Sequence, residues 1–156
     1  MRGEMSVIVR TIARITYALI LVFGFYVILH GHLTPGGGFQ GGAVVASGFA
    51  LLPVAFGAAA AKRYLNPSLM RHLEEVGSLA FLALGFLGIG ISFFYNVLAN
   101  SGSLFGAAVP FGPNSGILNS AGTLPFMNWA VGLKVMTGLM TIVLVLLVGA
   151  GKEGKD

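Results

Sequence analysis

The sequence has 156 residues, of which 56% are hydrophobic and only 9% are charged. A water-soluble domain of this length needs a largely polar surface, which so few charged side chains do not supply. Composition therefore excludes an ordinary soluble domain. The formal net charge of +4 suits anionic lipid at a membrane surface, and nucleic acid is not an expected partner. The absence of cysteine excludes disulfide frameworks and thiolate metal sites.

Four apolar blocks follow one another along the chain, at approximately residues 7–29, 39–61, 76–98 and 126–148. Each has about 23 residues, enough for a helix to cross a hydrocarbon core about 30 Å thick. The blocks are apolar on all sides instead of alternating, which excludes the strands of a membrane barrel. We therefore predict an all-α membrane protein in which residues 1–156 form a single transmembrane domain with four transmembrane helices.

The positive charges predict the orientation of these helices. All nine Lys and Arg residues except Lys134 lie at the N-terminal end, between the second and third blocks, or at the C-terminus. Because positive residues stay on the cytoplasmic side, both termini are expected to be cytoplasmic in a multi-pass protein of the cell (plasma) membrane. The long outer loop, 99–125, has no charge, and we expect it to pack as a lid, or partly re-entrantly, on its own helices or on a neighbouring subunit.

The outer connection between the first two blocks, HGHLTPGGGFQGG at 30–42, concentrates glycine and polar residues. It contains the GxGxxG spacing of dinucleotide sites at Gly36, Gly38 and Gly41. Such a site needs a preceding strand and an acidic residue about 20 positions later. Here an apolar block precedes the motif and alanines occupy 58–61. A phosphate-binding P-loop is also excluded, because no Gly-Lys-Ser/Thr follows.

One interpretation of this stretch is a tight turn followed by close helix packing. Pro35 fixes the backbone of the turn, and glycine tolerates unusual backbone angles. Gly37 and Gly41 are one helical turn apart, as are Gly38 and Gly42. Small residues at this spacing allow a neighbouring helix to lie directly on the backbone.

A second interpretation adds a hydrated ion entrance. His30, His32 and Gln40 are polar and are expected to face protein or water instead of lipid. Histidine exchanges protons near neutral pH, so His30 or His32 is a candidate proton relay. Two histidines without a convincing third ligand do not make a metal site, and no metal or other cofactor is expected in this chain.

The same stretch carries a family resemblance. GHLTPGGGFQGGAVVA, at 31–46, resembles the G-H-x-x-P-G-G-G-F-Q-G-G motif of the B subunit of Mrp-type multisubunit sodium/proton antiporters, the MnhB-related family. A second stretch, NWAVGLKVMTGL at 128–139, resembles the N-x-x-x-G-L-K-V segment of its last helix. The residues that match the first motif are Gly31, His32, Pro35, Gly36, Gly37, Gly38, Phe39, Gln40, Gly41 and Gly42.

The resemblance covers nearly the whole chain and implies a subunit of a cation/proton antiporter module. Such a subunit contributes to sodium or proton translocation and to assembly of the membrane arm. The resemblance also implies partners: antiporter-like membrane subunits and, in complexes related to membrane-bound hydrogenases or other ferredoxin-linked enzymes, a peripheral redox arm. We expect no catalytic site in this chain, because its predicted helices contain no nucleophile–base pair and no metal constellation.

Lys134 is the charged residue within a predicted helix that demands an explanation. It lies about eight residues, or roughly 12 Å, inside the fourth block, where a lysine costs roughly 2.5–3.5 kcal/mol on insertion scales. Lys134 either reaches toward headgroups or another subunit's carboxylate, or lines or gates a cation path. With the predicted bounds, no Asp or Glu lies inside a helix, so an anionic partner of Lys134 is expected to come from elsewhere. Glu74 and Glu75 are expected in an interfacial ion-pair cluster with Arg71 and His72, at the cytoplasmic entry to the third helix.

Two alternatives remain open. One is a purely structural subunit that packs helices and has no ion path. The other is a small independent exporter, for which the sequence lacks the expected intramembrane carboxylate.

Overall fold

The computed structural model describes residues 5–57, 65–109, 111 and 116–153. This part of the chain forms four α-helices and no strand, which confirms the predicted all-α class. The helices are α1 (Val7–His30), α2 (Gly38–Phe56), α4 (Pro67–Phe86) and α5 (Leu124–Glu153). Three stretches are long and apolar enough to cross a membrane: α1, α2 and Leu124–Leu147 of α5. The count of four crossings, and their orientation, stay predictions.

The first, second and last helices begin close to the predicted positions. Ser6 caps α1, accepting a hydrogen bond from the Val9 amide at 3.4 Å. The second helix ends at Phe56, earlier than predicted, and Gly57 follows with a φ of +83°. The end of the predicted second helix, at 58–61, lies outside the described residues. The last helix runs beyond the predicted end at residue 148, to Glu153.

The predicted third helix, 76–98, is wrong at both ends, because α4 spans Pro67–Phe86. Asn66 caps this helix by accepting from the Ser68 amide at 3.0 Å, and Pro67 follows with a backbone angle suited to the first helical turn. The helix ends where the chain turns back, since the Phe94 amide donates to the Gly85 carbonyl at 2.9 Å. The hydropathy pattern missed the first half of α4 because charged residues occupy it.

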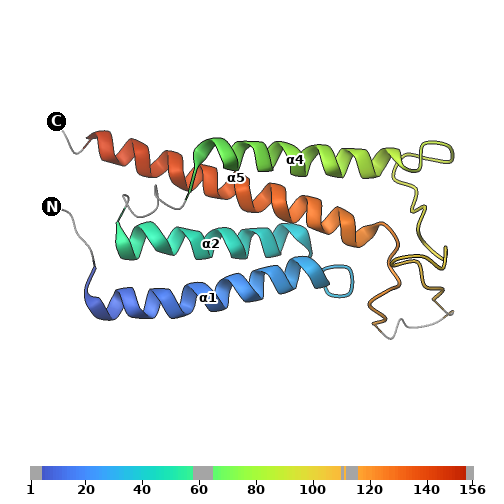
Figure 1. Ribbon diagram of the computed structural model, residues 1–156, viewed down its shortest axis with the longest axis horizontal. Coiled ribbons are helices and arrows are strands. Elements are labelled where there is room, and N and C mark those ends of the chain that lie inside the picture. The colour runs from blue at the N-terminus through green and yellow to red at the C-terminus, as the bar shows by residue number, and fades with distance from the viewer. Residues whose placement is uncertain (1–4, 58–64, 110, 112–115, 154–156) are drawn as a thin grey trace.

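The helices form an open row in the order α1, α2, α5 and α4 (Figure 1). Among the described helices, α4 approaches only α5 closely, and α1 makes a minor contact with α5. The start of α1 and the end of α5 lie at the same end of the bundle (Figure 1). At the other end, α4 projects beyond α1 and α2, next to the segment that leads into α5 (Figure 1).

A small core connects the helices, and most large side chains point outward. The buried apolar core residues are Ile28, Val45, Ala46, Leu65, Met70, Met140 and Leu144. On the outward face of α1, by contrast, Leu19 is 66% and Val22 is 71% exposed. Such an apolar exterior would be costly in water and suits lipid or other membrane subunits.

Candidate functional site

The glycines at the start of α2 place that helix directly between α1 and α5. A Cβ atom at Gly38 would overlap the Asn128 carbonyl oxygen, and one at Gly42 would lie 2.8 Å from the Gly132 carbonyl oxygen. On the other side, a Cβ at Gly41 would lie 2.8 Å from the Gly24 carbonyl oxygen. These distances leave no room for a side chain. We call Gly38, Gly41 and Gly42 the glycine seam.

The turn before α2 is equally tight. Gly36 has a φ of +103°, a backbone angle that favours glycine. A Cβ at Gly31 would overlap the Cα of Gly37. Gln40 is exposed, and its Oε1 accepts a hydrogen bond from the Gly37 amide at 2.7 Å. The structure therefore gives Gln40 a role in capping α2.

The remaining motif residues, Pro35 and Phe39, are exposed at this end of the bundle. Phe39 is 63% exposed and lies on the surface of α2, away from the glycine seam. An aromatic ring in this position suits the membrane interface or a neighbouring subunit.

The two candidate histidines lie together at the C-terminal end of α1 and in the turn that follows it. His32 Nε2 is 3.0 Å from the Leu118 carbonyl oxygen, so this nitrogen donates the hydrogen bond. The His30 ring stacks on Tyr26 at 5.1 Å, and the two imidazole rings are 6.4 Å apart. Both Nδ1 atoms are buried without a hydrogen-bond partner among the described residues. No group of three or more His, Cys, Asp or Glu that suits a metal occurs in that part of the chain.

Phe105 anchors the connection between α4 and α5 next to the end of α1 and the start of α5. We call the described part of this connection, 87–109, 111 and 116–123, the outer segment. Its ring contacts those of His32 at 5.9 Å, Phe126 at 5.5 Å and Trp129 at 6.0 Å. The Gly122 amide donates to the Phe105 carbonyl at 2.6 Å. Around Phe105 the outer segment thus packs on the chain's own helices, whereas Leu104 and Leu118 are 65% and 58% exposed.

Asn96 holds the last turn of this segment. Its Nδ2 donates to the Ala121 carbonyl at 3.1 Å, and its Oδ1 accepts from the Thr123 amide at 2.8 Å and the Thr123 hydroxyl at 3.1 Å. One side chain therefore fixes the chain just before α5.

Lys134 has an anionic partner in this chain. Its Nζ lies 3.7 Å from Glu74 Oε1, with the two side chains 49% and 36% exposed. The expectation that a partner must come from elsewhere is therefore wrong, as is the placement of Glu74 at the entry to the third helix. Glu74 lies within α4, and the sequence interpretation failed because it started that helix too late.

Two glycines bring this pair together at the α4–α5 crossing. A Cβ at Gly77 would lie 2.9 Å from both the Ala130 carbonyl oxygen and the Lys134 amide nitrogen. A Cβ at Gly138 would lie 3.3 Å from Glu74 Oε1. The backbones therefore cross closely at Gly77, and Glu74 lies over Gly138. The sequence signal for this arrangement was the Asn-Pro cap at 66–67.

The other charged residues of α4 point away from α5. His72 Nδ1 lies 3.4 Å from Glu75 Oε2, and these side chains are 69% and 58% exposed. Arg71 is also exposed. Part of the expected cluster is present, but it lies inside α4 and not before the helix.

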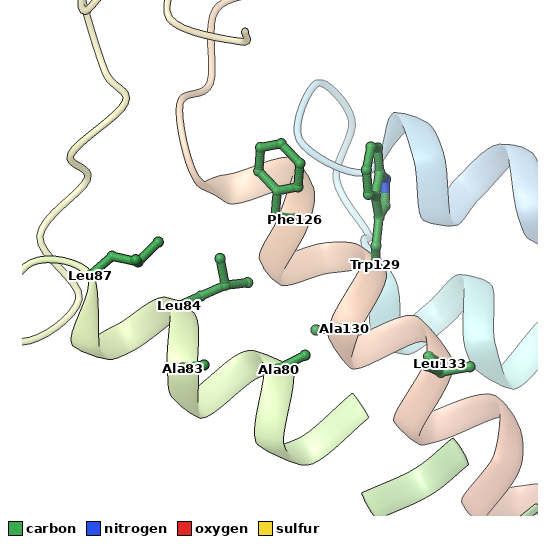
Figure 2. A pocket seen from close by; sticks show the side chains of 8 residues that line it. All are labelled: Ala80, Ala83, Leu84, Leu87, Phe126, Trp129, Ala130 and Leu133. Atoms are coloured by element: carbon green, nitrogen blue, oxygen red, sulfur yellow. The ribbon is translucent and has the colours of Figure 1, made fainter. Parts of the chain in front are cut away.

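An open apolar cleft lies between the C-terminal half of α4 and the N-terminal part of α5 (Figure 2). Its volume is about 500 Å³, and its lining is Ala80, Ala83, Leu84, Leu87, Phe126, Trp129, Ala130 and Leu133. Figure 2 shows Ala80 and Leu84 of α4 pointing toward α5, with Ala130 of α5 opposite them, while the rings of Phe126 and Trp129 extend upward from α5 in this view. Such a lining suits hydrocarbon and offers no ligands to an ion.

Comparisons with known proteins agree with the motif. Residues 8–141 match the family described as "Domain related to MnhB subunit of Na+/H+ antiporter". An uncharacterized protein of Methanocaldococcus jannaschii is 38% identical over 139 residues, covering 89% of this chain and 51% of that protein. A Staphylococcus haemolyticus protein described as antiporter subunit mnhB2 is 47% identical over 53 residues, covering 34% of this chain and 38% of that protein.

A solved structure matches nearly the whole chain. It is a chain of the membrane-bound sulfane sulfur reductase, described as an archaeal respiratory membrane complex, with a TM-score of 0.73 and 32% identity. The match covers 94% of this chain and 60% of that one, and the chain spans about half of the M. jannaschii relative. This chain is a multi-pass membrane protein, and it belongs to the family of domains related to the MnhB subunit of Na+/H+ antiporters.

Proposed function

We propose that this chain is a membrane subunit of a multisubunit cation/proton antiporter module, where it takes part in sodium or proton translocation and in assembly of the membrane arm. The observation that carries the proposal is the Glu74–Lys134 ion pair at 3.7 Å. Lys134 lies within Leu124–Leu147, a stretch able to cross a membrane. Charged residues at such depth are costly, and they typically mark ion paths or contacts with partner charges.

We further propose four crossings of the plasma membrane, with both termini cytoplasmic. In support, α1 begins and α5 ends at one end of the bundle (Figure 1), where the predicted cytoplasmic cations also cluster in the sequence. The fourth crossing is α4, whose charged residues need shielding by protein or water.

The ion pair offers a simple chemistry for coupling. The Glu74 carboxylate binds cations through its oxygens, so a sodium ion or a proton can take the place of the Lys134 ammonium. Both side chains are partly exposed, which leaves a route for such exchange. His30, His32 and the outer segment form the proposed outer entrance, with the buried Nδ1 atoms as its proton-binding groups.

The module works either as a stand-alone antiporter or as part of a redox-coupled complex. Relatives of both descriptions support this: an antiporter subunit and a chain of a respiratory membrane complex. In this proposal, antiporter-like subunits are neighbours of this chain in either kind of complex. A peripheral redox arm is a further partner in the redox-coupled complex, where other chains hold any redox cofactor.

A purely structural role is the second candidate, favoured by the glycine seam, which packs α2 on both neighbours. The alternative of a small independent exporter requires a carboxylate within a helix, and Glu74 supplies one because it lies within α4. Its charge is nevertheless matched by Lys134, and the 32% identity over 94% of the chain to part of a respiratory complex supports a subunit.

The decisive experiment measures sodium-dependent proton movement in membrane vesicles that contain the intact complex with Lys134→Met or Glu74→Gln. The matched control is Thr141→Val in α5, whose hydroxyl donates to the Thr137 carbonyl of its own helix, 2.9 Å away. We expect assembled complexes with strongly reduced flux for the first two variants and normal flux for the control. Normal flux in Lys134→Met with normal assembly would contradict the translocation role and favour the structural one.

A further inference from the structure

The face of α4 that points away from α5 carries its own charged group. Arg71, His72 and Glu75 are exposed, and they share one face because they lie three and four residues apart. We call these three residues the charged face of α4. His72 and Glu75 contact each other at 3.4 Å, whereas no ion pair to Arg71 occurs within the described ranges.

The charged face lies level with the middle of α5. Glu74 contacts Gly138, and Met70 shares a pocket with Met136 and Met140. These α5 residues lie within the membrane-crossing stretch Leu124–Leu147, seven to eleven residues from its end at Leu147. At 1.5 Å per residue, Met140, Gly138 and Met136 are roughly 10, 14 and 17 Å from that end. The short side chains of His72 and Glu75 do not reach the headgroups from this depth.

The charged face of α4 differs from the outward face of α1. The outward side chains of α1, such as Leu19 and Val22, are apolar and suit lipid. An exposed guanidinium beside an exposed carboxylate in hydrocarbon would carry a large desolvation cost. Farther toward the outer end, the exposed residues of α4 become apolar again, with Leu79 at 65% and Phe86 at 48% exposure. The charged face thus needs a polar protein surface against it.

We propose that the charged face of α4 is the docking surface for a membrane-embedded helix of another subunit, which presents a carboxylate to Arg71. Arginine is always charged, and its planar group of donors fits a carboxylate. Within the described residues, Glu74 pairs with Lys134 and Glu75 with His72. The inference rests on the membrane placement in the proposed function, but not on any role in translocation.

Site-specific photo-crosslinking tests this surface in the intact complex in native membranes. A benzophenone amino acid at position 72 is compared with one at position 19, on the apolar face of α1. We expect position 72 to crosslink to one membrane-spanning peptide of another subunit, with an Asp or Glu within one turn of the linked residue. Crosslinks only to lipid, to a second copy of this chain, or to the same peptide from position 19 would overturn the proposal.

A charge exchange then tests the chemistry. Arg71→Glu is expected to lower co-purification of the crosslinked subunit at least about tenfold, which corresponds to roughly 1.4 kcal/mol. Changing the identified carboxylate to Arg in the same complex restores the yield. Failure of this rescue overturns the charge pairing. Because co-purification is the readout, the result is independent of the flux measured in Lys134→Met, and the two proposals fail separately.

Discussion

Glu74 and Lys134 form an ion pair across the α4–α5 crossing, although 60 positions of sequence separate them, and Gly77 lets the two backbones approach closely enough for that contact. The pair and the crossing depend on each other. Without the close approach the charges would separate, and without the partner each charge would lie alone within the membrane-crossing part of the bundle.

Reversing either charge of the pair places two like charges together. Either Glu74→Lys or Lys134→Glu is expected to lower the stability of the complex by roughly 2.5–3.5 kcal/mol, which is the cost of an uncompensated charge at depth in the membrane. The double exchange, Glu74→Lys with Lys134→Glu, restores the attraction. The yield and thermal stability of the purified complex, compared between the single and double variants, measure whether the double exchange restores the pair. A double variant no better than the single ones would show that the pair contributes nothing to assembly.

The α4–α5 crossing is expected to be intolerant of side chains at Gly77. Gly77→Leu must displace α5 backbone, because the added Cβ would lie 2.9 Å from the Ala130 carbonyl oxygen. We expect the free energy of unfolding to fall by roughly 1–3 kcal/mol, as at other overpacked sites. Gly90→Leu is the control, since a Cβ there meets nothing within 4 Å. Equal melting temperatures for the two purified variants would contradict the close approach of the two backbones at Gly77.

The glycine seam gives a separate prediction for assembly. Gly42→Leu would force α2 away from Gly132 of α5, whereas Gly149→Leu enters open space near the end of α5. We expect the first variant to abolish recovery of the complex and the second to leave it unchanged. Blue native electrophoresis of mild detergent extracts measures the outcome. Full assembly of Gly42→Leu would mean that this helix contact tolerates separation.

The sequence predicted the helical class, the start of α1 and the position of the glycine-rich turn, because each depends on local pattern. It could not predict the Glu74–Lys134 contact. The predicted third helix started too late, because the first half of α4 is charged and not apolar. The contact also depends on how α4 lies along α5, which no local pattern predicts. The role of Gln40 was also missed, because its contact with the Gly37 amide depends on the turn's conformation. The Asn66–Pro67 cap was the local signal that could have moved the start of α4.

His32 ties the outer segment to the turn that follows α1 through its 3.0 Å hydrogen bond to the Leu118 carbonyl. His32→Ala removes this bond, which contributes about 0.5–1.5 kcal/mol, and is expected to increase amide hydrogen exchange around Leu118 by roughly two- to tenfold. His32→Gln keeps a donor and is expected to recover part of the protection. The readout is exchange mass spectrometry on the purified complex, with peptides from the middle of α1 as the internal reference. Unchanged exchange in His32→Ala would show that Phe105 and Asn96 hold the segment without the histidine. A loss of protection in α1 as well would indicate general unfolding, and the hydrogen bond itself would then not explain the change.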